Sequence, residues 1–256
     1  MTIHLYSGAG NTFVVLDGRR SEPLPIGISS LCREYRTDGL MILKTSAGYD
    51  FAMEYYNSDG SGGMMCGNGG RCIVSFASFL GIEPGKDGIY RFLAPDGPHE
   101  AQILSRNGAG QVVKLRMKDV DEYRTALDGG WFVDTGTRHY VKFCEDVEAI
   151  DIAAEGPRYR HDPSFAPVGV NANFVQLLST GEETAFKIRT FEKGVEAETL
   201  ACGTGITASA VALCLKGTEN SHYKVFARQD TLSVDLRREG DTFTDVYLTG
   251  PTLKVL

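Results

Sequence analysis

Hydrophobic and polar positions alternate with a period of two in several short segments of this chain. The alternation is clearest in residues 51–55, 113–117, 186–190 and 232–236. Because successive side chains of a strand point to opposite faces, this pattern is typical of half-buried β-strands. A further strand is expected near the end of the chain, at 246–255. The sequence therefore predicts a protein rich in sheet.

Helices are expected in fewer places, and two of the candidates have no polar face. The four predicted helices span residues 28–36, 71–80, 147–154 and 204–216. The second and the fourth are apolar on nearly every side, and such helices are buried all round. The architecture that satisfies these elements most simply is an α+β fold of two pseudo-symmetric domains. In each domain a mixed sheet would wrap around one central buried helix.

A short motif occurs twice and supports this twofold organisation. One copy reads Met65-Cys66-Gly67-Asn68-Gly69 and the other reads Ala201-Cys202-Gly203-Thr204-Gly205. The two cysteines lie 136 positions apart in 256 residues, about half the length of the chain. The charged segment 117–121 is the expected boundary. We predict an N-terminal half of residues 1–118 with a returning strand at about 246–256, and a C-terminal half of residues 119–245.

Composition narrows the classes of function. The chain is 42% hydrophobic and 23% charged, which is ordinary for a globular protein. Its net charge of -7 comes without a basic face, so neither a nucleic acid nor an anionic membrane is an expected partner. No apolar run approaches the roughly 20 residues of a membrane span, and the first residues lack a secretory signal. The predicted location is cytoplasmic and the predicted partner is a small molecule.

The six cysteines are expected to be free thiols. A metal site is not expected, because the nearest pair, Cys66 and Cys72, has no histidine close by in sequence. Four of the six have no supporting motif or lie inside the apolar helices, and are read as structural: Cys32, Cys72, Cys144 and Cys214. Candidate chemistry therefore rests with Cys66 and Cys202.

Each of these two thiols precedes a glycine turn and a buried helix. The partial positive charge of a helix N-terminus favours a thiolate and also attracts a carboxylate. If the two loops faced each other across a cleft, one thiolate could remove an α-proton while the other thiol protonated the opposite face. N–H donors aimed at the substrate carboxylate would stabilise the carbanion. Taken singly, a Cys-Gly-x-Gly motif is more often a glycine turn with a buried cysteine.

Several motifs in order resemble those of diaminopimelate epimerases, which are pyridoxal-phosphate-independent racemases with two cysteines. Besides the two cysteine motifs, the matching segments are Gly8-Ala9-Gly10-Asn11-Thr12-Phe13, Asn57-Ser58-Asp59-Gly60-Ser61, Gly136-Thr137-Arg138-His139, Asn171-Ala172-Asn173-Phe174-Val175 and Glu192-Lys193-Gly194. The resemblance implies an isomerase that interconverts LL- and meso-diaminopimelate, for lysine and peptidoglycan synthesis, with no cofactor. It also implies that the active site lies in the cleft between the two domains.

The resemblance also implies roles for individual residues. Cys66 and Cys202 would be the acid–base pair. The carboxylate at the reacting carbon would be held by Gly67, Asn68, Gly203 and Thr204, with Asn11 close by. The distant amino-acid end would be held by Asn57, Asn171, Glu192 and Lys193. His139 and Glu192 would tune the pKa values of the thiols.

The chain departs from the family pattern at the distal end of the site. Lys193 stands where the family usually has Arg, and Thr137-Arg138 stands where Asn-Pro is favoured. Gly39 stands where some members place Gln, so Gly39, Thr137 and Arg138 are positions where a substitute contact would arise. Because lysine cannot form the bidentate fork of arginine, we expect relaxed substrate discrimination. Leu256 replaces an aromatic residue associated with dimer contact, which leaves a homodimer open.

Three other readings remain at this point. The chain could be a two-cysteine racemase of glutamate, proline or hydroxyproline. It could be a non-catalytic amino-acid-binding protein of the same fold, although binding alone needs no pair of thiols. It could also be a redox switch that uses Cys66 and Cys202.

Overall fold

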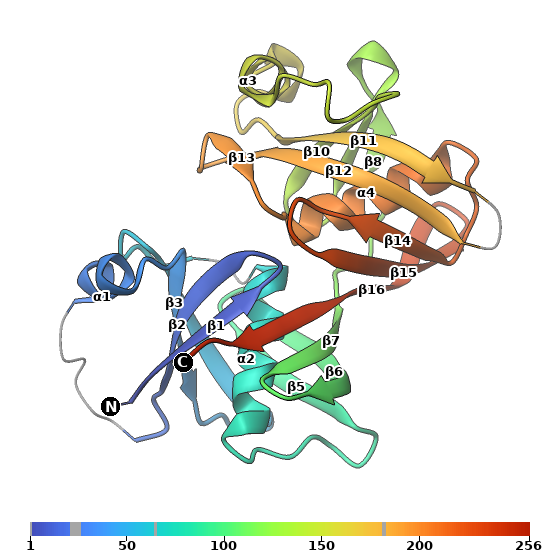
Figure 1. The fold of residues 1–256 in the computed structure, drawn as a ribbon. Coiled ribbons are helices and arrows are strands. Elements are labelled where there is room, and N and C mark those ends of the chain that lie inside the picture. The colour runs from blue at the N-terminus through green and yellow to red at the C-terminus, as the bar shows by residue number, and fades with distance from the viewer. Residues whose placement is uncertain (1, 21–26, 64–65, 181–182) are drawn as a thin grey trace. The chain divides into compact units, whose positions relative to one another are not determined.

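The computed structural model describes residues 2–20, 27–63, 66–180 and 183–256. The chain divides into two compact units, one of Met1–Arg116 with Gly250–Leu256 and the other of Met117–Thr249. Figure 1 shows a curved sheet and a central helix in each unit. No helix in the described residues is long and apolar enough to cross a membrane.

The first unit is a closed barrel of eight strands. Its strands are β1 (Ile3–Gly8), β2 (Asn11–Asp17), β3 (Gly39–Lys44), β4 (Phe51–Asn57), β5 (Ile89–Ala94), β6 (Gly97–Asn107), β7 (Gly110–Arg116) and the end of β16 (Thr242–Lys254). Neighbours pair in this order, and β16 pairs with both β7 and β1, which closes the ring. The pairs β2–β3 and β4–β5 are parallel and the others are antiparallel.

Two helices accompany this barrel, one inside and one outside. The inner helix α2 (Gly67–Phe79) packs against β1, β2, β3, β6 and β7, and its residues 67–77 are all buried. The outer helix α1 (Ile28–Tyr35) covers β2 and β3, where Leu31 and Cys32 join a cluster with Val14 and Leu40. The inner helix is therefore enclosed by sheet, as its apolar sequence predicts.

The second unit repeats this arrangement. Its strands run β8 (Tyr123–Thr125), β9 (Trp131–Asp134), β10 (Arg138–Phe143), β11 (Asn171–Ser179), β12 (Thr184–Glu192), β14 (His222–Phe226), β15 (Thr231–Glu239) and the first part of β16. The short strand β13 (Ala197–Thr199) pairs with β12. A bridge between Val120 and Phe243 links the chain just before β8 to β16. Two single 3-10 turns, Leu127–Gly129 and Pro163–Phe165, lie in the connections.

The strand directions and helix positions match between the units. The pairs β10–β11 and β12–β14 are parallel, as are β2–β3 and β4–β5 in the first unit. The outer helix α3 (Ile152–Arg160) lies between β10 and β11 in sequence and packs on β11 and β12. The inner helix α4 (Gly203–Leu215) packs on β9, β10, β11 and β15. The predicted α+β fold with a twofold repeat is confirmed.

The inner helices are buried although they carry polar side chains. In α4 the Thr207 hydroxyl donates to the Gly203 carbonyl at 3.1 Å, and the Ser209 hydroxyl donates to the Gly205 carbonyl at 2.7 Å. Because a buried hydroxyl is costly only when it lacks a partner, these bonds let the helix sit within the sheet.

Two helix predictions need correction. The helix expected at 147–154 is wrong: α3 begins at Ile152 and continues to Arg160. The Asp151 carboxylate accepts from the Ala153 and Ala154 amides at 3.1 and 3.2 Å, so it is the N-cap that starts the helix. The helix expected from residue 71 begins four residues earlier at Gly67, because the Cys66 side chain caps it.

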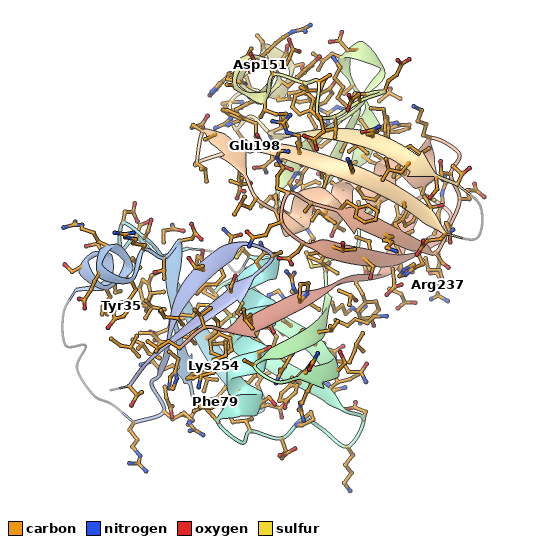
Figure 2. All side chains as sticks on the ribbon, in the orientation of Figure 1. Tyr35, Phe79, Asp151, Glu198, Arg237 and Lys254 are labelled. Carbon is orange, nitrogen blue, oxygen red and sulfur yellow. The ribbon has the colours of Figure 1, made fainter. Side chains whose placement is uncertain are left out.

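We expect the first barrel to depend on Phe76 in α2, which is fully buried between Tyr6 and His4. Phe76→Ala should lower the free energy of unfolding by about 3–5 kcal/mol, because it removes buried area and leaves a cavity. Phe79→Ala is the matched control: Phe79 lies in the same helix, is 51% exposed and packs beneath Lys254, as Figure 2 shows. Urea unfolding of both variants tests this, and equal losses would contradict it.

Candidate active site

Cys66 is the N-cap residue of α2. Its backbone is extended, with φ of -100° and ψ of 150°, and its Sγ accepts a hydrogen bond from the Gly69 amide at 3.2 Å. A Cβ on Gly69 would lie 3.3 Å from that sulfur, so the absence of a side chain permits the close approach. The thiol therefore sits at the positive end of a 13-residue helix. Met65, which opens the motif, lies outside the described residues.

The residues beside Cys66 are tied to a buried guanidinium. Asn68 is 2% exposed, and its Nδ2 donates to the Asn11 Oδ1 at 2.6 Å. The Arg71 side chain is fully buried; it donates to the Asn68 Oδ1 at 2.8 Å and to the Gly67 carbonyl at 3.1 Å. Because both ends of the Asn68 amide are bonded, its orientation is fixed. The structure thus brings together Asn11, Asn68 and the Cys66 loop.

Gly39 and Asn57 lie opposite each other at the adjacent ends of β3 and β4. The Asn57 amide donates to the Ser61 hydroxyl at 3.0 Å in the turn that follows β4. A Cβ on Gly39 would lie 2.7 Å from the Tyr56 carbonyl oxygen and 3.2 Å from the Tyr55 hydroxyl. Position 39 therefore has no room for a side chain unless its neighbours shift.

Cys202 is the N-cap residue of α4 and is 8% exposed. Its Sγ lies 3.5 Å from the Thr204 hydroxyl, which in turn accepts from the Thr137 hydroxyl at 3.1 Å. The Thr137 hydroxyl lies 2.8 Å from Nε2 of His139. A chain of side-chain contacts therefore links the sulfur to a histidine of β10.

His139 is fully buried, and its far side is held by Asn173. The Asn173 amide nitrogen lies 3.2 Å from the His139 Nδ1 and 3.0 Å from the Tyr140 carbonyl oxygen. Burial, with a smaller contribution from the positive charge of Lys193, lowers the pKa of His139 to about 3. The imidazole is therefore neutral at physiological pH.

Three of the four predicted distal residues, Asn171, Glu192 and Lys193, lie where β10 and β11 begin and β12 ends, whereas Asn57 belongs to the first unit. The Asn171 amide donates to the Arg138 carbonyl at 3.1 Å, and its oxygen accepts from the Lys193 amide at 2.9 Å. The Glu192 carboxylate accepts from the Thr199 hydroxyl at 2.8 Å, which joins β12 to the strand leading to Cys202. These bonds hold Asn171 and Glu192 in place, while Lys193 and Arg138 are only half-buried.

Two residues to which the sequence analysis assigned no role prove central to the geometry. Arg71 lies under the Cys66 loop, and Asn173 lies behind His139. A sequence signal for Arg71 existed, because a charge inside an otherwise apolar helix must find a buried partner. Asn173 gave a weaker signal: a polar residue at an interior position of a strand.

Each of the remaining four cysteines has a raised pKa. Burial raises the pKa of Cys72 to about 12, and it also raises the pKa values of Cys32, Cys144 and Cys214. A thiol with a raised pKa stays protonated and is a poor base. These four residues therefore behave as small apolar residues.

Because the pKa of His139 is lowered, its contribution to stability should depend on pH. The unfolded chain binds a proton at this residue below about pH 6.5 and the folded chain does not, so stability falls as pH falls below 6.5. From pH 7 to pH 5 the wild type should lose about 2 kcal/mol more free energy of unfolding than His139→Gln. Urea unfolding at both pH values measures this, and parallel pH dependences would contradict it.

Comparison with known proteins identifies the family of this chain. The family model described as "Diaminopimelate epimerase" matches residues 3–120 and 131–255. The diaminopimelate epimerase of Flavobacterium psychrophilum is 38% identical over 258 residues, covering 98% of this chain and 96% of that protein. That of Chlorobaculum tepidum is 39% identical over 267 residues, covering 97% of each.

Solved structures share the fold at low sequence identity. A PhzF-family phenazine biosynthesis protein of Bacillus anthracis matches with a TM-score of 0.78 at 11% identity, over 99% of this chain and 96% of that one. A probable proline racemase of Agrobacterium radiobacter matches with a TM-score of 0.62 at 16% identity, over 99% and 89%. The family match over nearly the whole chain, with relatives of this similarity, leads to one conclusion. This chain belongs to the diaminopimelate epimerase family.

Proposed function

We propose that this protein interconverts LL- and meso-diaminopimelate, with Cys66 and Cys202 as its acid–base pair. The observation that carries this proposal is their equivalence. Each thiol is the N-cap of a fully enclosed helix, at the same point of the same strand topology, in one of two repeated units. The names of the relatives support the choice of substrate. The product would serve lysine and peptidoglycan synthesis.

In the proposed reaction, one cysteine thiolate takes the α-proton and the other cysteine thiol delivers a proton to the opposite face of the same carbon. The electron pair released from the C–H bond passes into the substrate carboxylate and then forms the new C–H bond. Exchanging the roles of the two thiols runs the reaction backwards. This scheme requires both loops to contact one substrate molecule from its two sides.

The proposed recognition of the reacting carboxylate uses the two helix N-termini. The backbone amides of Gly67, Asn68, Gly203 and Thr204 would donate to it, and Asn11 lies in contact with Asn68. Helix N-termini suit an anion because their amides point outward and the helix dipole adds positive potential. The charge that develops on this carboxylate during proton transfer would strengthen the same hydrogen bonds.

The proposed recognition of the distal amino-acid end explains the preference for a long substrate. Asn57, Asn171 and the Glu192 carboxylate would bind its polar groups, and Lys193 supplies a cation for its carboxylate. Glutamate and proline lack this second amino-acid end, so polar groups here would remain without partners. A purely binding protein would need no pair of thiols at two equivalent helix N-termini, and a redox switch would need no polar groups for an amino-acid substrate.

The proposed mechanism also bears on where the protein works. Both thiols must be reduced for this mechanism to operate. We therefore expect the protein to act in the cytoplasm, where thiols stay reduced.

We predict that Cys66→Ser and Cys202→Ser each reduce epimerisation by at least about 10²–10³-fold, because a serine hydroxyl is a far weaker acid and base than a thiol. The measurement is the rate at which LL-diaminopimelate is converted to the meso form, followed by chiral chromatography with fully reduced protein. Cys144→Ser is the control, because this half-buried thiol lies outside the proposed site. Wild-type rates in either variant would exclude the two-thiol mechanism.

We also predict that Lys193 loosens selection of the distal carboxylate. The Lys193→Arg variant should raise the ratio of kcat/KM for diaminopimelate over L-glutamate, because guanidinium binds a carboxylate through two parallel hydrogen bonds. Steady-state kinetics on both substrates would show this change. A wild-type preference above about 10⁴-fold, typical of sites whose polar groups all demand partners, would contradict relaxed selection.

A further inference from the structure

We propose that Asn173, His139 and Thr137 are positioning residues that aim the hydroxyl proton of Thr204 at the Cys202 sulfur, and that Cys66 is held in a different way. This inference deepens the proposed function, because it assigns a task to groups behind one of the two thiols. It rests on the direction of four successive hydrogen bonds within the second unit.

The direction begins with the amide of Asn173. The Tyr140 carbonyl oxygen can only accept, so the atom 3.0 Å from it must be the amide nitrogen of Asn173. The amide oxygen then accepts from the Thr190 hydroxyl at 2.9 Å. The same nitrogen lies 3.2 Å from the His139 Nδ1 and 3.4 Å from the Asn171 carbonyl oxygen, so its second hydrogen faces these two acceptors. The Tyr140 carbonyl, which can only accept, therefore fixes which end of this amide faces His139.

The Asn173 amide in turn selects the tautomer of His139. An amide nitrogen cannot accept a hydrogen bond, so the His139 Nδ1 must carry the lone pair and Nε2 must carry the hydrogen. Burial of the ring, with a smaller contribution from the positive charge of Lys193, disfavours a second proton on it. The Nε2–H consequently donates to the Thr137 hydroxyl oxygen at 2.8 Å.

Two threonine hydroxyls carry this direction to the sulfur. Thr137, which accepts from His139, donates to the Thr204 oxygen at 3.1 Å. Thr204 then directs its own hydrogen at the Cys202 Sγ, 3.5 Å away. An O–H donor stabilises a thiolate more than a thiol, because its partial positive charge faces the full negative charge. This series of hydrogen bonds therefore favours the thiolate form of Cys202.

The first unit lacks the histidine at the equivalent point. In strand register Phe13 pairs with Gly39 and His139 pairs with Asn171, at corresponding parallel pairs, so Phe13 occupies the place of His139. The Asn11–Asn68 contact occupies the place of Thr137–Thr204. The Cys66 sulfur instead accepts from the Gly69 backbone amide. The two thiols are equivalent in topology but not in their donors.

Substitution of Thr137 tests the proposal without touching either cysteine. The rates at which iodoacetamide alkylates Cys66 and Cys202 are followed against pH by peptide mass spectrometry in the full chain. Thr137→Val should move the midpoint for Cys202 to higher pH by about 0.5 unit, a roughly threefold loss of rate below the midpoint. The Cys66 midpoint in the same samples is the internal control. Thr137→Ser, which keeps the hydroxyl, should restore the wild-type midpoint.

The charged residues nearest to this series of hydrogen bonds are not altered by these substitutions. They are Asp134 and Arg138, which flank the turn before His139, and Glu192 and Lys193 at the end of β12. An unchanged Cys202 midpoint in Thr137→Val, or an equal shift of both cysteines, would overturn the proposal. A midpoint that Thr137→Ser fails to restore would also overturn it.

The tautomer provides a second measurement on the unmodified protein. In protein labelled with ¹⁵N-histidine, NMR should show His139 neutral with the hydrogen on Nε2 from pH 6 to 9. A hydrogen on Nδ1 would overturn the proposal. Exchange of the substrate α-proton in D₂O tests the proposed function separately from the positioning role. If no exchange occurs but the Cys202 midpoint shifts as expected, only the proposed function is contradicted. If exchange occurs but the Cys202 midpoint does not shift, only the proposed role of the positioning residues is contradicted.

Discussion

The constraint on which this structure depends is that two helices have no face that can meet water. Every residue of α4 other than Thr204 and Leu215 is buried, and α2 is buried from Gly67 to Ala77. A helix of this kind must be surrounded, and a curved sheet that closes around it is the most economical enclosure. The only part of such a helix that opens outward is an end. The candidate chemistry occupies those ends because they alone combine burial, backbone donors and positive potential.

The repeat supplies two such ends, and the side chains behind them have diverged. On one side a buried arginine fixes Asn68 beneath Cys66. In the second unit a neutral histidine and two threonines form a series of hydrogen bonds that ends at Cys202. The two directions of the reaction exchange the roles of the thiols. The difference in hydrogen-bond donors allows the pKa of each thiol to match the α-proton that this thiol removes. Symmetry of fold therefore does not require symmetry of electrostatics.

Much of this organisation is readable from the sequence, because it follows from local pattern. Alternation at residues 51–55 and 186–190 marks strands, and the doubled Cys-Gly-x-Gly marks the start of two apolar helices. The misplaced helix at 147–154 shows where local reading fails: the Asp151 cap, not the apolar pattern, decides where that helix begins. The partners of Asn173 were not predictable, because His139, Tyr140 and Thr190 come from the neighbouring strands β10 and β12, far away in sequence. The partners of Arg71 lie three and four residues earlier on its own helix, but the contact of Asn68 with Asn11 joins residues 57 positions apart. Contacts of that kind depend on register, which a single sequence does not reveal.

The strand β16 has a consequence for the order in which the chain can fold. Its first part completes the second unit, and residues Gly250–Leu253 pair with β7 to close the first barrel. During synthesis, one edge of β1 and one edge of β7 therefore remain unpaired until all of Met117–Thr249 and the end of β16 have been made. The second unit is contiguous and can finish beforehand, so the half that begins first is completed last. Exposed strand edges of this kind attract other chains, which makes the nascent first barrel the stage most in need of protection from aggregation.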